Sequence, residues 1–278
     1  MKFCILANME IKENLNYINM IKTYLESISQ ICEIANSKQD IFGNYIYDNI
    51  PLDTNYLIVL GGDGTILQSV QNSIKINAPI IGFHTGTLGF LCEYQINSFK
   101  EIIDKIIKDE FLLEERMLIE VFKDEVLLDT CLNDIVISRE GFSRIVSIEV
   151  STNNEIVNKF RGDGIVVSTP TGSTGYNLSL GGPIVSPKSN NIIVTPIACH
   201  SLISRPIILS DNEIVNIEIL KSRKTQEKEA ILTCDGRKNI DLHSGDILTI
   251  KSSLNRVKFI KLEENKFFTI CNQKLKEF

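Results

Sequence analysis

The sequence predicts an α/β domain with a mostly parallel sheet, followed by an all-β domain of sandwich type. Strand and helix patterns alternate over about the first hundred residues, and short β-rich runs with polar turns follow from about residue 115. A chain of 278 residues, 43% of them hydrophobic, is long enough to form two modest cores. We therefore place the α/β domain at residues 1–112 and the β-rich domain at residues 113–255.

The α/β domain is predicted from apolar runs and from helical periodicity. Apolar runs of strand type lie at 3–7, 56–60 and 79–83, and apolar residues recur at three- and four-residue steps over 11–31, 66–74 and 98–108. The continuous run at 56–60 is typical of a strand that is buried on both faces. Because strands and helices alternate, we expect a parallel sheet with crossover helices.

The β-rich domain is predicted from ten short runs of strand-forming residues. They lie at 117–122, 126–131, 134–138, 145–151, 156–160, 192–195, 207–209, 214–220, 230–234 and 247–250. The charged stretch 221–229 is expected to be a solvated hairpin loop.

Composition excludes several classes of function. The net charge of −6 and the pI of about 5.3 argue against a nucleic-acid partner, which needs a basic surface. Apolar runs are too short for a signal peptide or a membrane span, so we expect a cytoplasmic protein with no membrane partner. Seven scattered cysteines without a CxxC pair indicate reduced thiols, and we predict no metal site built by the protein.

The strongest local motif is Gly61-Gly62-Asp63-Gly64-Thr65, directly after the run at 56–60. Glycines let the backbone approach a ligand, and amides at such a turn favour phosphate oxygens. A lysine after the last glycine is missing, so this is not a Walker A loop, and Leu67 breaks the dinucleotide fingerprint. Asp63 would either accept the proton of an attacking hydroxyl or help to hold a magnesium ion. The alternative is a structural turn in which Asp63 or Thr65 caps the next helix.

Three further segments carry polar groups of the kind that binds nucleosides. The longest is Arg161–Asn177, with six hydroxyl side chains from Ser168 through Tyr176. A second segment, Gly82–Leu91, follows a predicted strand and contains Phe90, which would flank a base or lie in the core. The third is the pair Asn133-Asp134 within a β-rich stretch, which by itself predicts only a turn or a strand edge.

Taken together, these segments resemble the NAD kinase family. The resemblance covers the chain from about residue 55 to residue 250 and includes Asp235-Gly236. Its first motif is shared with diacylglycerol, sphingosine and 6-phosphofructokinases, whereas the run from Gly162 to Tyr176 is more specific. The resemblance implies a C-terminal tail, residues 256–278, that returns to the first domain, and a site in the cleft between an α/β nucleotide-binding domain and a β-rich NAD-binding domain.

The resemblance also implies a reaction and roles for individual residues. The enzyme would transfer the terminal phosphoryl group of ATP, or of another donor, to the 2′-hydroxyl of the adenosine ribose of NAD, with Mg²⁺ or another divalent cation accompanying the donor. Asp63 would be the general base. The expected binding residues are Gly61, Gly62, Gly64 and Thr65 for donor phosphates, Phe90 beside the adenosine, Asn133 and Asp134 for NAD hydroxyls, Asp163 at the nicotinamide end, and Ser173, Thr174, Gly175 and Tyr176 around the adenine. A homodimer or homotetramer is implied.

Some residues depart from the family pattern or have two interpretations. The family usually has Glu where this chain has Asp134, and Ala where it has Gly175. Arg161 would pair with Asp163 or contact a phosphate. His200 is expected to be a structural or supporting histidine near the site.

Two other functions remain open at this stage. A lipid kinase of the diacylglycerol kinase type would share Gly61–Thr65, although the acidic pI speaks against a membrane-facing surface. A non-catalytic NAD-binding regulator would share the nucleoside segments, although Asp63 argues against it.

Overall fold

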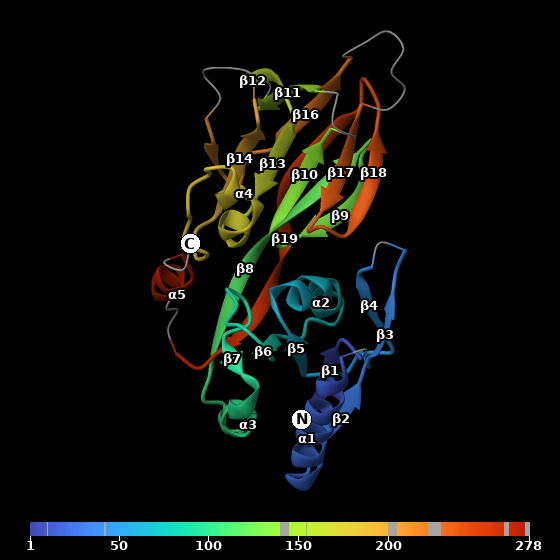
Figure 1. Cartoon of the computed structure of the whole chain (residues 1–278), viewed down its shortest axis with the longest axis vertical. Helices are drawn as coiled ribbons and strands as arrows, with labels where there is room; N and C mark the ends of the chain where they lie inside the picture. The colour runs from blue at the N-terminus through green and yellow to red at the C-terminus, as the bar shows by residue number, and fades with distance from the viewer. Residues whose placement is uncertain are drawn as a thin grey trace. The chain divides into compact units, whose positions relative to one another are not determined.

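The computed structural model describes residues 1–9, 11–41, 43–139, 145–153, 155–199, 205–221, 229–263 and 267–275 (Figure 1). His200 and most of the predicted charged loop, residues 222–228, lie outside the described residues. The chain divides into two compact units, which consist of Met1–Glu115 with Val257–Phe278, and of Arg116–Arg256. It passes from unit 1 to unit 2 within strand β8 (Leu112–Lys123) and returns within strand β19 (Ile247–Lys261).

Unit 1 is built around a parallel sheet. Its strands lie in the order β2 (Ile31–Ile34), β1 (Lys2–Ala7), β5 (Tyr56–Gly61) and β6 (Ile80–His84), and β6 also pairs with β7 (Tyr94–Gln95) and with the end of β19. The pairs β1–β2, β1–β5 and β5–β6 are all parallel. These central strands are almost wholly buried, which explains their continuous apolar runs.

Helices cover both faces of this sheet. On one face, Phe3 and Ile5 of β1 share a core with α1 (Lys12–Ser27) and α3 (Phe99–Ile107). On the other face lies α2 (Asp63–Ile76), because a Cβ added at Gly82 of β6 would lie only 2.9 Å from Cδ1 of Ile66. This three-layer arrangement follows from right-handed crossovers between parallel strands.

Smaller elements of unit 1 have weaker sequence signals. Strands β3 (Asn36–Gln39) and β4 (Tyr45–Asp48) form an antiparallel hairpin, and a 3₁₀ turn, η1 (Ile96–Ser98), precedes α3. After β19, the short helix α5 (Phe267–Lys274) follows near the C-terminus. Strand β2, the hairpin and α5 were not predicted, because the three strands are only four residues long each and α5 mixes apolar with polar residues.

Unit 2 is a sandwich of antiparallel sheets around one apolar core. One sheet has the order β12 (Glu155–Gly162), β11 (Val146–Thr152), β16 (Val215–Leu220) and β19, and β8 joins it to β9 (Val126–Cys131). The other has the order β15 (Ile207–Ser210), β14 (Asn191–Ile197), β13 (Gly164–Ser168), β10 (Asp134–Ser138), β17 (Ala230–Cys234) and β18 (Lys238–Leu242). A 3₁₀ turn, η2 (Thr171–Thr174), and α4 (Tyr176–Ser179) follow β13.

The predicted fold class, an α/β domain followed by an all-β sandwich, is confirmed. Two strands of unit 2, β13 and β18, were not predicted. Gly164–Ser168 forms β13, a fully buried central strand, although the sequence analysis treated this stretch as part of a ligand-binding segment. In the part of the chain that the structure describes, no helix is long and apolar enough to cross a bilayer.

Candidate active site

The Gly61–Thr65 motif forms the turn from β5 into α2. Gly61 ends β5, Gly62 occupies the N-cap position, and Asp63 is the first helical residue. The helix therefore begins at Asp63 and not at Ile66, because the carbonyl of Gly62 already accepts the amides of Thr65 (3.0 Å) and Ile66 (3.2 Å). Gly62 and Gly64 are exposed, so the first amides of α2 are accessible to a ligand. Such a helix N-terminus favours phosphate oxygens.

The side chain of Asp63 is held by three consecutive backbone amides. Its Oδ2 accepts the N–H of Phe90 at 2.8 Å, and its Oδ1 accepts those of Leu91 at 2.9 Å and Cys92 at 3.1 Å. A carboxylate offers about four acceptor positions, so these bonds leave one of them, on Oδ2. Among the described residues no hydrogen bond uses that position, and Asp63 is partly exposed. The carboxylate is thus fixed in place and still able to accept one proton.

Gly89 is required for this arrangement because the backbone comes very close to the carboxylate. A Cβ added at Gly89 would lie 2.0 Å from Oδ1 of Asp63, well inside van der Waals contact. The amide of Gly89 also bonds to the carbonyl of Cys92 at 3.1 Å, which closes the turn. We call Gly89–Cys92 the carboxylate-binding loop.

Phe90 projects from the same loop and is partly exposed. Its ring lies 6.4 Å from that of Phe267 in α5, with the planes inclined by 48°. The ammonium of Lys274, also in α5, lies 4.6 Å from the centroid of Phe90, in cation–π geometry. The predicted adenosine contact is therefore also a contact of the C-terminal helix.

In unit 2, the pair Asn133-Asp134 lies at the start of β10 and is organised by Asp235. The Asp235 carboxylate accepts the amides of Leu132 (2.8 Å), Asn133 (2.8 Å) and Asp134 (3.0 Å). Asp235 itself adopts a left-handed conformation, with φ of 44°, and its carboxylate lies 3.8 Å from Arg237. A second buried aspartate thus fixes the backbone of the predicted NAD-binding pair.

Asp134 is a nearly buried carboxylate, with only 7% of its surface exposed. Burial, and then the neighbouring Asp235, raise the pKa of Asp134 to about 7. Its charged form is therefore disfavoured unless a donor reaches it. A ribose hydroxyl is a donor of that kind.

Several hydroxyl groups of the Ser168–Tyr176 segment bond to backbone groups of unit 2 and are therefore not available to a ligand. Thr169 donates to the carbonyl of Leu132 at 2.5 Å, and Ser173 donates to the carbonyl of Val185 at 3.2 Å while accepting its amide at 3.0 Å. Ser173 is fully buried, Thr174 is partly exposed, and Tyr176 is 43% exposed. Of the predicted adenine-pocket side chains, Thr174 and Tyr176 therefore remain accessible.

This segment lies directly against the Asn133-Asp134 pair. A Cβ added at Gly172 would lie 2.2 Å from the carbonyl oxygen of Asn133, so only glycine fits there. A Cβ added at Gly175 would lie 3.7 Å from Oδ2 of Asp134 and 3.8 Å from Nδ2 of Asn133. The structure thus brings Asn133, Asp134 and Gly175 together in one cluster.

Asp163 is paired with a residue that the sequence analysis did not consider. Nε of Arg139 lies 2.6 Å from one oxygen of Asp163, and Nη2 lies 3.3 Å from the other. The backbone amide of Arg139 also donates to the carbonyl of Asp163 at 2.8 Å. Arg161, the partner that had been considered, is exposed on β12 and pairs in register with Ser147 of β11.

The described residues contain no group of three His, Cys, Asp or Glu side chains placed to hold a metal ion. Magnesium usually binds through one or two carboxylates together with substrate phosphates and water.

Comparison with known families decides between the remaining interpretations. The family model for the ATP-NAD kinase N-terminal domain matches residues 9–111, and that for the ATP-NAD kinase C-terminal domain matches residues 132–262. The chain belongs to the ATP-NAD kinase family. Both halves match, so the lipid kinase alternative, which would share only the first motif, is not favoured.

Relatives in this family span the whole chain. The NAD kinase of Lachnoclostridium phytofermentans is 42% identical over 280 residues, which cover 98% of each chain. The NAD kinase of Agathobacter rectalis is 36% identical over 276 residues, again with 98% of each chain covered.

Solved structures show the same fold. A yeast NADH kinase complexed with NADH superposes with a TM-score of 0.87 at 23% identity, covering 99% of this chain and 87% of that one. An NAD kinase from Archaeoglobus fulgidus in complex with ATP superposes with a TM-score of 0.79 at 24% identity and complete coverage of both chains.

Three residues that shape the candidate site were not among the residues predicted from the sequence. They are Gly89, Arg139 and Asp235. Asp235-Gly236 is a turn dipeptide, a signal that was available but indicates no particular partner. Arg139 and Gly89 lie 24 and 26 residues from Asp163 and Asp63 (163−139 and 89−63), so no local pattern links them.

Proposed function

We propose that this chain is an NAD kinase, which transfers the terminal phosphoryl group of ATP or another donor to the 2′-hydroxyl of the adenosine ribose of NAD. Its full-length relatives with this name support the proposal. The observation that carries it is the Asp63 carboxylate, which three amides hold at the N-terminus of α2, beside exposed glycine amides. A fixed proton acceptor and a phosphate-binding turn therefore occur in one five-residue segment.

Each part of this arrangement has a task in the reaction. The amides of Gly62, Gly64 and Thr65 bind donor phosphates, and the remaining acceptor position of Asp63 takes the proton from the ribose hydroxyl. A divalent cation that accompanies the donor offsets charge on the phosphates. Because the carboxylate is already oriented, little reorganisation is needed at the moment of transfer.

Recognition of NAD is assigned to residues of several segments. Phe90 provides an aromatic surface for the adenosine, and Asn133 and Asp134 bind its hydroxyls. Thr174, Gly175 and Tyr176 line the adenine, with Ser173 shaping the loop behind them. Asp163 serves the nicotinamide end, and Arg161 is proposed to contact phosphate. Assembly as a homodimer or homotetramer remains a prediction, and so does a cytoplasmic location.

The test is a direct assay of NADP formation. Purified protein is incubated with ATP, Mg²⁺ and NAD, and NADP is measured with an NADP-specific dehydrogenase. Asp63→Asn should lower kcat by about 10²–10⁴-fold, since a positioned base contributes that much. The affinity for NAD, measured by calorimetry, should change little.

The control is Asp109→Asn, which makes the same change at an exposed position where Asn tolerates the left-handed conformation (φ of 61°). It should leave kcat unchanged. NAD binding without any NADP from the wild-type chain would favour the non-catalytic regulator. Normal turnover by Asp63→Asn would refute the role of Asp63.

A further inference from the structure

The carboxylate-binding loop is held from outside by the end of the chain. The loop and the residues after it, through Tyr94, contact the segment Ile260–Lys274, which returns to unit 1 after the whole of unit 2. We call Ile260–Lys274 the C-terminal clamp, of which residues 260–263 and 267–274 are described. Three separate contacts join it to the loop and to the two residues that follow the loop.

The first contact is a buried ion pair. Lys261 is only 4% exposed, and its ammonium pairs with the carboxylate of Glu93. The carboxylate of Glu114 lies 3.9 Å from the same ammonium. Glu93 directly follows Cys92, whose amide binds Asp63. A buried ammonium is costly unless it is paired, so Lys261 and Glu93 hold each other in place.

The second contact uses the neighbouring residue, Tyr94. Its hydroxyl accepts the amide of Leu262 at 2.8 Å and donates to the carbonyl of Ile260 at 3.3 Å. These bonds tie Tyr94 to the backbone on both sides of Lys261. Residues 93 and 94 are therefore fixed to residues 260–262 by side chains and main chain together.

The third contact lies at the other end of the loop. The ring of Phe90 contacts Phe267 and lies beneath the ammonium of Lys274, as described above. The clamp thus holds both Phe90 and Glu93. The two residues between them, Leu91 and Cys92, supply two of the three amides that bind Asp63.

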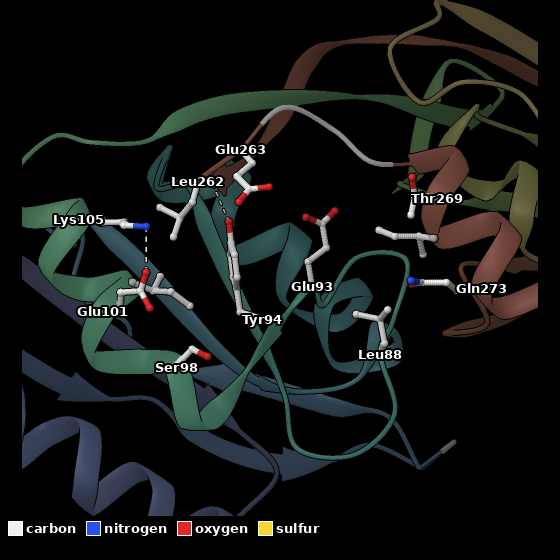
Figure 2. A pocket seen from close by; sticks show the side chains of 12 residues that line it. Leu88, Glu93, Tyr94, Ser98, Glu101, Lys105, Leu262, Glu263, Thr269 and Gln273 are labelled. Carbon is white, nitrogen blue, oxygen red and sulfur yellow. Dashed lines mark hydrogen bonds and ion pairs between the residues drawn. The ribbon is translucent and has the colours of Figure 1, made fainter.

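A cavity of about 390 Å³ lies beside the residues that flank the loop (Figure 2). Its lining comes from both sides of the loop (Leu88, Glu93 and Tyr94), from the clamp (Leu262, Glu263, Thr269, Ile270 and Gln273) and from the region of α3 (Ser98, Glu101, Ile102 and Lys105). Side chains that face a cavity lose packing contacts on that side. The polar contacts of Glu93 and Tyr94 with the clamp therefore contribute to the position of these two residues where packing is incomplete.

We propose that the C-terminal clamp positions the general base, and that Lys261 is the positioning residue through which it acts. This inference rests on the proposed function. Lys261 touches no reacting atom; it holds Glu93, which fixes the Cys92 amide and hence the carboxylate of Asp63. A displacement of about 1 Å at a reacting group costs about 10²-fold in rate, so loosening the loop should lower kcat.

The test compares Lys261→Met with Lys258→Met. Lys258 lies on the same strand and is partly exposed, and its ammonium donates to the side chain of Asn77 at 3.1 Å. Lys261→Met should lower kcat between about 10-fold and 10²-fold in folded protein, with the KM for ATP within about twofold of the wild type. Lys258→Met should leave both unchanged. Lys261→Arg, which keeps the charge, should recover most of the lost kcat.

A double-mutant cycle distinguishes positioning from a merely structural role. If Lys261 acts through Asp63, adding Lys261→Met to Asp63→Asn should lower the residual kcat less than about twofold. An equal loss in both backgrounds would overturn the inference, as would a wild-type kcat in Lys261→Met. NADP formation is followed by enzymatic cycling, so that the residual rates are measurable.

Lys261→Met removes the ammonium that pairs with Glu93 and lies 3.9 Å from Glu114, so circular dichroism first establishes whether the variant is folded. If it is unfolded, Lys274→Ala decides, since it removes a partly exposed cation above Phe90 and leaves the core intact. If Lys274→Ala lowers kcat in the wild type but not in the Asp63→Asn background, the result supports the role of the clamp. If Lys274→Ala leaves kcat unchanged, the result refutes that role. A wild-type chain that forms no NADP refutes the proposed function and the inference with it.

Discussion

Replacing Asp134 by asparagine should stabilise the protein above neutral pH and leave it unchanged in acid. Burial and the neighbouring Asp235 raise the pKa of Asp134 from 3.8 to about 7. Between these values the folded chain holds a proton that the unfolded chain releases, so stability falls as the pH rises through this window. The loss is complete above the folded pKa and is absent near pH 4.

The size of the effect follows from the shift in pKa. A difference of about three units between the folded and unfolded chain corresponds to roughly 4 kcal/mol, at about 1.4 kcal/mol per unit. Asparagine has the same shape as aspartate and no charge to bury, so Asp134→Asn removes this term. At pH 8 the variant should be more stable than the wild type by up to roughly 4 kcal/mol, and at pH 4 the two should be alike.

Urea unfolding of both proteins at pH 4, 5, 6, 7 and 8 measures this difference. Asp124→Asn is the matched control, because Asp124 is exposed in unit 2 and has a left-handed backbone, with φ of 50°. Its difference from the wild type should not depend on pH in this window. The reasoning is refuted if the stability difference between Asp134→Asn and the wild type is the same at pH 4 and pH 8.

The carboxylate of Asp134 lowers stability at high pH, and its proposed role in binding gives a second prediction. If ionised Asp134 accepts a hydroxyl of NAD, the affinity for NAD should fall as the pH drops below about 7. Asp134→Asn should lower that affinity at pH 8 and remove its dependence on pH. Binding sites often keep such groups at the expense of stability.

Two further substitutions test the geometry of each unit. Gly89→Ala places a methyl group 2.0 Å from Oδ1 of Asp63 and should lower kcat by about 10²-fold, whereas Gly86→Ala, with no heavy atom within 4 Å of the added carbon, should not change it. Asn177→Ala, at a fully buried position, removes hydrogen bonds with Thr195 (2.7 Å) and with the carbonyls of Ser173 (3.1 Å) and Pro183 (3.1 Å). Urea unfolding should show that the free energy of unfolding falls by about 3 kcal/mol. A kcat unchanged in Gly89→Ala, or a loss below about 1 kcal/mol in Asn177→Ala, would contradict these assignments.

Periodicity was a reliable guide for long buried elements. The strands predicted at 3–7, 56–60 and 79–83 appear as β1, β5 and β6, with ends that differ by a residue or so. It failed for short or mixed segments such as β3, β4 and α5, where few side chains are buried. It also missed β13, because glycines and hydroxyls flank the run Ile165–Val167 and dominated its interpretation.

The sequence by itself determined the order of α/β and β-rich parts, the turn that carries Asp63, and the resemblance that the family models confirm. These properties are local: hydrophobic spacing reports which residues are buried, and glycines report where the backbone must turn.

Only the tertiary structure decided which groups hold the candidate site residues. Asp63 bonds to amides 27 to 29 residues away, and Asp235 bonds to amides 101 to 103 residues away. Lys261 reaches Glu93 across 168 residues. Such partners leave no periodic trace, because they meet only after strands have paired and the chain has returned to its first unit.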